Sequence, residues 1–355
     1  MAEESARAVG VPPEVLAAYG WAGATCESVP SLINRTFRLQ PGTGQGAVLQ
    51  RLHAIFAPEV NLDIEAVTRR LQERGVPTPR LLRTVDDRPW TEHQGAFWRA
   101  LSLEPGVTHH TLTSPVQAHS AGLAVGRFHR ALFDFDYAFK AARSGVHDTA
   151  AHLEGLQAAL ATPAAVADPE VQQLGCEILD AAHVLSRHGE LSSLPLRICH
   201  GDLKISNLLF EAGDEGRALC LIDLDTVAPQ QLAYELGDAL RSWCNSRPED
   251  APQPNFDEAI FEAGLRGYAV GSKGLASAAE WASIVAGVQT VALELSSRFA
   301  RDAIELSRFG WDPDRYPSRR AHNLARARSQ LALSRLIAGR AQALGDLAER
   351  VRQGV

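Results

Sequence analysis

The chain has 355 residues, a formal net charge of -7, 45% hydrophobic residues and 22% charged residues, which is ordinary for a globular protein. The acidic balance gives no global positive field for nucleic acid, and the absence of an apolar run of about 18 residues argues against a membrane span. Five scattered cysteines and an N-terminus without an apolar signal segment predict a cytoplasmic protein with free thiols.

The first hundred residues carry strand signals around one central helix. Proline at the start and glycine at the end of 12–20 predict a short helix. Residues 31–53 predict a strand, a Gly-rich turn over 41–46 and a second strand. The helical period of 61–75 ends at a glycine, and 79–106 predict two more strands around a polar turn before a Pro-Gly break.

Beyond residue 106 the pattern changes to long helices. Apolar residues at helical period predict helices over 115–133, 150–160, 168–188, 257–268, 276–304 and 320–351. Because 355 residues are too many for one compact core, we expect two lobes in an α+β fold. A small strand-rich lobe would cover residues 1–103, and a large helical lobe would cover residues 104–355.

One dense polar segment, CHGDLKISNLLF, lies at residues 199–210 inside the helical lobe. Its HGDLKISN part has the spacing H-x-D-x-x-x-x-N of kinase catalytic loops. Phosphoryl transfer needs a carboxylate to orient the attacking hydroxyl and oxygen ligands to hold Mg²⁺ on the phosphates. The spacing therefore predicts Asp202 as the base and Asn207 as a metal ligand.

The residues that follow predict a β-hairpin. An apolar strand, a turn rich in Gly, Asp and Glu, and a second strand lead to Asp223 and Asp225. Because a hairpin brings its open ends together, Asn207 and Asp223 are expected to face one metal ion. Asp225 is expected to point to the same side of an extended chain and share that metal, or else to support the ligands.

These motifs, H-G-D with a following Asn and then I-D-L-D, resemble those of the aminoglycoside phosphotransferase and choline kinase superfamily. The resemblance implies a protein-kinase-like bilobal fold, ATP and Mg²⁺ as cofactors, and a small-molecule acceptor. Other segments resemble, in the same order, the bacterial N-acetylhexosamine 1-kinase group: INRTFRL, VLQRLH, VTRRL, FWRALSLEPG, GLAVGRFHRAL, HDT, IDLDTVAP, YELGDALR and HNLARARSQ. That group tends to have H-N-D where this chain has H-G-D, and a Gly-Asp-x-Tyr-Phe-like segment where it has SRFGWDPDRYP.

A kinase fold places a cation on the third strand, paired with a helix glutamate. This chain carries Gln50 at that position with Arg51 beside it, and strand alternation sends the two side chains to opposite faces. Either Gln50 binds the phosphates by hydrogen bonds, or Arg51 supplies the charge through a shifted register. Glu65 is the candidate for the helix glutamate, or it is a solvated residue.

The remaining nucleotide contacts are expected at the two ends of the strand-rich lobe. Ser31 and Asn34 would cover the phosphates, since no G-x-G-x-x-G segment is present. Leu101 and Leu103 fall where the two lobes meet, where kinase folds hold adenine through backbone groups.

Two further residues of the polar segment are candidates with alternatives. Lys204 is either a phosphate contact or a solvated lysine of the loop. His200 is expected to orient the loop by hydrogen bonds rather than to act in catalysis.

The acceptor site is predicted less directly. Asp202 would contact the acceptor hydroxyl. Asp238 and Arg241 lie on one helical face at i, i+3, which favours a pair that braces the loop over a substrate contact. His147 and Arg320 are acceptor-site candidates that the resemblance implies.

The leading hypothesis is an ATP-dependent kinase that phosphorylates the anomeric hydroxyl of an N-acetylhexosamine or related sugar. One alternative keeps the chemistry and changes the acceptor to an aminoglycoside or another amino-alcohol. A second alternative, suggested by Gln50, is a catalytically weak nucleotide-binding protein. A protein kinase is disfavoured because no A-P-E segment follows I-D-L-D.

Overall fold

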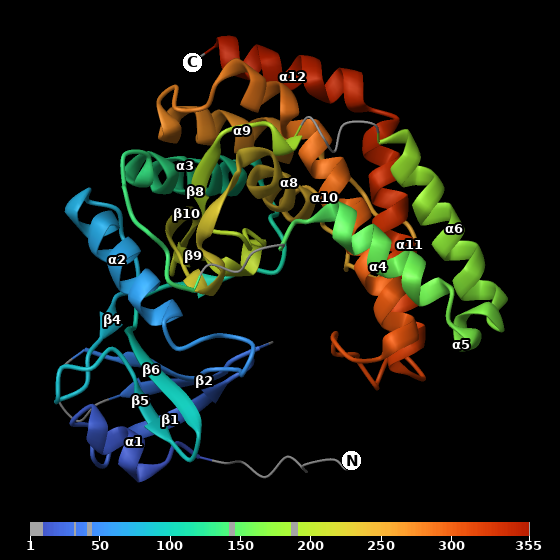
Figure 1. Ribbon diagram of the computed structural model, residues 1–355. Helices are drawn as coiled ribbons and strands as arrows, with labels where there is room; N and C mark the ends of the chain where they lie inside the picture. Colours follow the sequence, from blue (N-terminus) through green and yellow to red (C-terminus); the bar gives the residue numbers. More distant parts are fainter. Residues whose placement is uncertain (1–9, 32, 41–44, 142–145, 186–190, 355) are drawn as a thin grey trace. The chain divides into compact units, whose positions relative to one another are not determined.

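The computed structural model describes residues 10–31, 33–40, 45–141, 146–185 and 191–354 (Figure 1). Contacts divide the chain into two compact units. The strand-rich unit comprises Met1–Pro105, Asp134–Ala142 and Cys220–Val227. The helical unit comprises Gly106–Phe133, Arg143–Leu219 and Ala228–Val355. The predicted α+β class, with strands first and helices after, is confirmed.

The strand-rich unit is built on a twisted antiparallel sheet. Its strand order is β1 (Thr25–Val29), β2 (Arg35–Gln40), β3 (Ala47–Arg51), β6 (Ala96–Ser102) and β4 (Leu81–Leu82), with β5 (Thr91–His93) also paired to β6. Strand β1 was not predicted, because none of its five residues is buried and its pattern has no apolar alternation. Four residues of the predicted turn, 41–44, lie outside the described residues.

Two helices accompany this sheet, α1 (Pro13–Ala18) and α2 (Val60–Glu73). Val15 and Leu16 of α1 pack with Leu49 of β3 and with Trp98 and Ala100 of β6 in one buried core. Since side chains alternate along a strand, the residues between these core positions point to the other face of the sheet. That other face carries Gln50, with Thr36 and Arg99 beside it in the strand register.

Most of the helical unit is made of long helices (Figure 1). The long helices are α3 (Pro115–Leu132), α4 (Thr149–Leu160), α6 (Pro169–Val184), α8 (Leu232–Trp243), α9 (Glu258–Ser272), α10 (Ala278–Glu305), α11 (Arg319–Ala338) and α12 (Ala341–Gln353), and a single short turn of helix, α5 (Pro163–Val166), lies between α4 and α6. The single helix predicted over 320–351 is wrong, because the chain breaks at Gly339 and Arg340 into α11 and α12. The predicted end of the helix over 168–188 lies partly outside the described residues. None of the described helices is both long and apolar enough to cross a bilayer.

Glycines set how closely these helices approach. A Cβ atom on Gly267 of α9 would lie 1.9 Å from the carbonyl oxygen of His119 in α3. A Cβ on Gly287 of α10 would lie 1.9 Å from the carbonyl oxygen of Ala233 in α8. Both pairs of helices therefore pack backbone to backbone. Helix α8 is held in place by this close contact with α10.

Two small sheets complete the helical unit. β9 (Leu208–Glu211) and β10 (Asp214–Leu221) form the predicted hairpin, and β7 (Val107–Thr108) adds to the edge of β9. β8 (Leu196–Cys199) pairs with β11 (Ala228–Gln231). The polar segment thus begins at the end of β8 and enters β9 through a short 3₁₀ turn, η1 (Ile205–Asn207).

Candidate active site

The loop after β8 contains a glycine that its backbone requires. Gly201 has a φ of +81°, which is in the left-handed region. Glycine adopts this conformation without steric cost, and asparagine is among the few other residues that tolerate it. Glycine in H-G-D and asparagine in H-N-D can therefore both adopt the left-handed conformation that this position requires.

Asp202, Lys204 and Asn207 come together in this loop. The Nδ2 of Asn207 donates to the backbone oxygen of Asp202 at 2.9 Å and to its Oδ2 at 3.0 Å. Lys204 forms a short ion pair with the same Oδ2. Because the amide nitrogen of Asn207 is committed to Asp202, its Oδ1 is left to act as a hard oxygen ligand of the kind that Mg²⁺ binds. About a third of the Asp202 side chain stays exposed.

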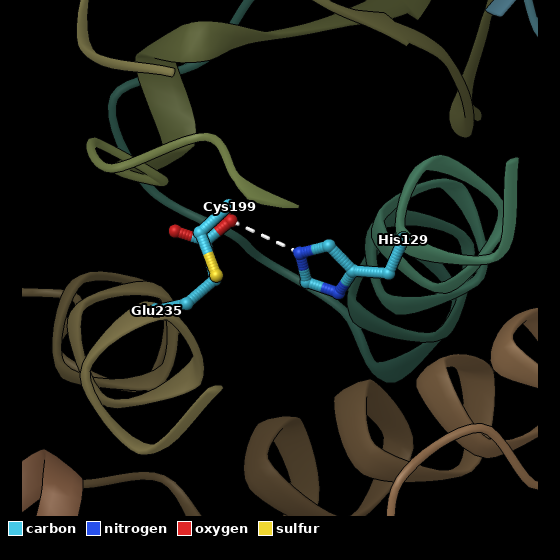
Figure 2. A group of neighbouring side chains, drawn as sticks. All are labelled: His129, Cys199 and Glu235. Carbon is cyan, nitrogen blue, oxygen red and sulfur yellow. Dashed lines mark hydrogen bonds and ion pairs between the residues drawn. The ribbon is translucent and has the colours of Figure 1, made fainter. Parts of the chain in front are cut away.

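A buried glutamate that was not among the predicted site residues holds the loop through its backbone. Glu235 of α8 accepts the backbone N–H of His200 at 2.7 Å through Oε1 and that of Gly201 at 2.9 Å through Oε2. Figure 2 shows the third partner, His129 of α3, whose Nε2 lies 3.1 Å from Oε1 of Glu235. Two helices are therefore connected to the catalytic loop through one carboxylate.

This carboxylate is charged in spite of its burial. Burial alone would raise the pKa of Glu235, but the hydrogen bond and charge of His129, the charge of His200 and the N–H of Gly201 together hold it below its usual value. Charge-assisted bonds of this kind are the stronger ones in proteins. The expectation that His200 orients the loop fits its full burial and the bond between its backbone and Glu235.

Cys199 also lies beside His129 and Glu235 in Figure 2, and the three together have the composition of a metal site. Burial raises the pKa of the Cys199 thiol well above its usual value. Its Sγ donates to the backbone oxygen of Gln230 at 3.5 Å. A protonated thiol is a poor nucleophile, and the contacts that these three side chains make are the ones that brace the loop.

Asp238 and Arg241 of α8 form the predicted pair, with Arg241 Nη2 2.9 Å from Asp238 Oδ1. Burial lowers the pKa of Arg241, and the carboxylates of Asp238, Glu249 and Asp202 reverse this to a net rise. Burial raises the pKa of Asp238, and Arg241, His147 and Lys204 reverse this to a net fall. The pair thus interacts electrostatically with Asp202 and Lys204 of the catalytic loop.

The other two acceptor-site candidates have partners of their own. His147 Nδ1 lies 3.2 Å from Glu294 Oε1, and its ring stacks on Tyr234 of α8. Arg320 forms ion pairs with Asp168 and with Glu170, the latter at 2.9 Å. Nothing in these contacts connects Arg320 with the catalytic loop.

The acidic residues after β10 belong to the strand-rich unit. Asp223 has a φ of +63°, a conformation that non-glycine residues rarely adopt and that often occurs at functional sites. The expectation of an extended chain from Asp223 to Asp225 is wrong, because Leu224–Thr226 form a 3₁₀ turn, η2. Both carboxylate oxygens of Asp225 already accept hydrogen bonds, Oδ1 from Arg99 and Oδ2 from Asn34 at 2.6 Å. These bonds commit Asp225 to the strand-rich unit.

The phosphate-binding candidates of the strand-rich unit are arranged differently from the expectation. Gln50 lies directly opposite Arg99 in the register of β3 and β6, whereas Arg51 lies opposite Trp98, on the face of the α1 core. Glu65 does not pair with either of them. It forms a two-pronged ion pair with Arg83, with both distances 2.7 Å.

The outer contacts predicted for the nucleotide are occupied by local bonds. Ser31 Oγ donates a short hydrogen bond to the backbone oxygen of Asn34. The N–H of Leu103 donates to the backbone oxygen of Gly46 at 3.1 Å, and Leu101 pairs with Val48 in the sheet register. These residues therefore shape the ends of the β2–β3 hairpin.

Comparison with known structures places this fold among kinase-like phosphotransferases. An aminoglycoside phosphotransferase from Alicyclobacillus acidocaldarius subsp. acidocaldarius DSM 446 is 18% identical, with a TM-score of 0.65 and 98% of each chain covered. A microcompartment-associated aminopropanol kinase is 16% identical, with a TM-score of 0.67, covering 94% of this chain and 97% of its own. An amicoumacin kinase in complex with AMP-PNP, Ca²⁺ and Ami is 14% identical, with a TM-score of 0.62 and coverages of 90% and 91%.

The family is shown by a sequence model. Residues 25–281 match the model of the phosphotransferase enzyme family, APH, and the chain belongs to that family. The matched range includes the catalytic loop, the β9–β10 hairpin and Asp223. The superfamily suggested by H-G-D and I-D-L-D is thereby confirmed, and the chain is an enzyme of the phosphotransferase class.

Proposed function

We propose that this protein is an ATP-dependent kinase that transfers the γ-phosphoryl group to a hydroxyl of a small molecule. The observation that carries the proposal is the loop geometry, in which Asn207 and Lys204 both bond the partly exposed carboxylate of Asp202. In this proposal Asp202 accepts a hydrogen bond from the acceptor hydroxyl and orients it toward the γ-phosphorus. Lys204 holds the carboxylate in place until the hydroxyl replaces it as partner.

Mg²⁺ is the proposed cofactor beside ATP, and it would neutralise the phosphate charge. Asn207 would hold it through Oδ1, and Asp223 would hold it through its carboxylate. These two residues lie at the two open ends of the β9–β10 hairpin, which supports the proposal. Asp225, bonded to Arg99 and Asn34, would act as a supporting group.

For the acceptor, we propose a neutral polyhydroxyl compound, with the anomeric hydroxyl of an N-acetylhexosamine as the first candidate. The carboxylates near the loop are each matched by a cation, Asp202 by Lys204, and Asp238 by Arg241. His147 likewise matches Glu294. A site whose carboxylates are already paired suits hydrogen-bonding hydroxyls better than an ammonium group. The glycine in H-G-D does not count against this group, as argued from φ at Gly201.

The second candidate is an amino-alcohol or an aminoglycoside. The similar structures named above are those of aminoglycoside, aminopropanol and amicoumacin kinases, and this favours a cationic acceptor. A cationic acceptor would have to displace Lys204 or Arg241 from its carboxylate. Raised salt should then weaken acceptor binding, whereas a neutral sugar should be insensitive to salt.

The test is the Asp202→Asn variant, assayed for ADP formation with hexosamines, other hexoses, amino-alcohols and aminoglycosides. Loss of an acid–base group typically lowers kcat by roughly 10²–10⁴, so kcat should fall by that factor while ATP still binds. Glu262→Gln, which alters only an exposed ion pair with Arg266, serves as the control. A kcat near that of the wild type in Asp202→Asn would refute the role of Asp202.

A further inference from the structure

The face of the sheet away from the α1 core carries a buried arginine. Arg99 of β6 is 1% exposed and lies directly opposite Gln50 in the strand register. Its Nε donates to Gln50 Oε1 at 2.8 Å, and its Nη1 bonds Asp225 Oδ1 and, at 3.5 Å, Asn61 Oδ1 of α2. A charged side chain so deeply buried requires a counter-charge and several fixed partners, and Arg99 has both.

The partners of Arg99 are themselves fixed. Asp225 accepts from Asn34 through its second oxygen, and the Oδ1 of Asn34 accepts the backbone N–H of His53 at 2.9 Å. Gln50 donates in turn to Thr36 Oγ1 at 3.2 Å. The guanidinium is therefore held in one orientation by a chain of hydrogen bonds that runs across β2, β3 and β6.

One nitrogen of this guanidinium stays outside the chain of bonds. Among the described residues, the hydrogen bonds of Arg99 use only Nε and Nη1. The two N–H groups of Nη2 remain for another acceptor, and a guanidinium suits a phosphate oxygen in charge and geometry.

The same sheet face offers an apolar surface beside the cation. Val48 and Leu101 form a half-buried register pair two residues along β3 and β6 from Gln50 and Arg99. At about 3.4 Å per residue, the two pairs are separated by about 7 Å. An apolar patch next to a fixed cation suits a purine base that continues into charged phosphates.

We infer that Arg99 supplies the positive charge for the phosphates of the nucleotide, in place of a lysine at position 50, with Asp225 as its acidic partner. The inference rests on the proposed function, because it assumes that ATP is the donor. It explains why position 50 can hold an uncharged glutamine, because Arg99, directly opposite on β6, supplies the positive charge. It also explains why Glu65 is free to pair with Arg83, since the acidic partner comes from η2.

The test compares the affinities of ATP, ADP and adenosine in the full-length protein by isothermal titration calorimetry with Mg²⁺. In Arg99→Gln, binding of ATP and ADP should weaken by roughly 10- to 100-fold, the loss expected for a charge-assisted hydrogen bond, while adenosine binding stays unchanged. Arg99→Lys should keep most of the affinity. Gln50→Lys added to Arg99→Gln moves the charge across the register pair and should restore ATP binding.

Two controls separate a nucleotide contact from a purely structural role. Arg266→Gln removes an exposed arginine of α9 that pairs with Glu262 and should leave all three affinities unchanged. If Arg99→Gln does not fold, Arg99→Gln with Asp225→Asn removes both buried charges and should show the same selective loss.

The outcomes distinguish this inference from the proposed function. A folded Arg99→Gln, or the double variant, with the wild-type preference for ATP over adenosine would overturn the inference alone. A wild-type protein that binds ATP no more tightly than adenosine would overturn the proposed function and the inference with it.

Discussion

Glu235 offers the sharpest test of how the catalytic loop is held. In Glu235→Ala, the N–H groups of His200 and Gly201 lose their acceptor, and His129 loses its partner. An unsatisfied buried donor costs about 1–3 kcal/mol, so the two backbone groups together should cost about 2–6 kcal/mol. Glu235→Gln keeps one acceptor oxygen and should cost about 1–3 kcal/mol.

The assay is urea unfolding combined with steady-state kinetics. Because whole domains are stable by only about 5–15 kcal/mol, Glu235→Ala is expected to approach the unfolding threshold, and Glu235→Gln is the variant for kinetics. Its kcat should fall, since Gly201 directly precedes Asp202 in the chain. Glu262→Gln on α9, an exposed pair with Arg266, should change stability by about 0–1 kcal/mol.

The pH dependence gives an independent check. The pKa of Glu235 is below its usual value of 4.5 in the folded protein. Its contribution is therefore complete above the unfolded pKa and is lost as the pH falls through the lower, folded value. The stability difference between wild type and Glu235→Gln should shrink below about pH 4.5. A Glu235→Gln variant as stable and as active as the wild type would refute the bracing role.

Three further predictions concern packing, charge and metal. Gly267→Ala should destabilise by about 1–3 kcal/mol in urea unfolding because its Cβ has no room, whereas Gly345→Ala on α12, with nothing within 4 Å, should stabilise by about 0.5–1 kcal/mol; equal effects would contradict the packing argument. Burial lowers the pKa of His147, but Glu294 raises it above 6.5 overall. The stability advantage of wild type over His147→Gln should thus be present below pH 6.5 and decline as the pH rises through the folded pKa; an advantage that grows toward high pH would be incompatible with this. Asp223→Gly, which keeps the left-handed backbone, should abolish the Mg²⁺ dependence of ADP binding in calorimetry, and a retained Mg²⁺ effect would exclude Asp223 as a ligand.

The sequence was sufficient where local patterns are strong. The strand–helix–strand order, the long helices and the β9–β10 hairpin follow from periodicity and turn residues, and the spacing of Asp202 and Asn207 follows from the motif. The helix break at Gly339 was missed because the apolar period of α11 continues into α12. The turn at Leu224–Thr226 was missed because nothing local distinguishes it from the end of a strand.

The polar partnerships could not be predicted, because they join residues far apart in the chain. Arg99 is 126 residues from Asp225, and Glu235 is 106 residues from His129. For Arg99 and for Glu235, the sequence contains one indication of a buried polar partnership. Arg99 is a charged residue inside the apolar strand FWRALS, and Glu235 is an acidic residue in the mostly apolar segment QLAYELG.

The most direct test of the central claim is the phosphorus NMR spectrum of the product formed from ATP, Mg²⁺ and a panel of acceptors. The account predicts ADP and one new phosphomonoester, with an N-acetylhexosamine giving a sugar 1-phosphate and its 1-deoxy analogue binding without reaction. Turnover of aminoglycosides or amino-alcohols alone would contradict the sugar proposal and leave the kinase chemistry intact. ATP that remains unchanged with every acceptor in the panel would contradict the proposal of a small-molecule kinase.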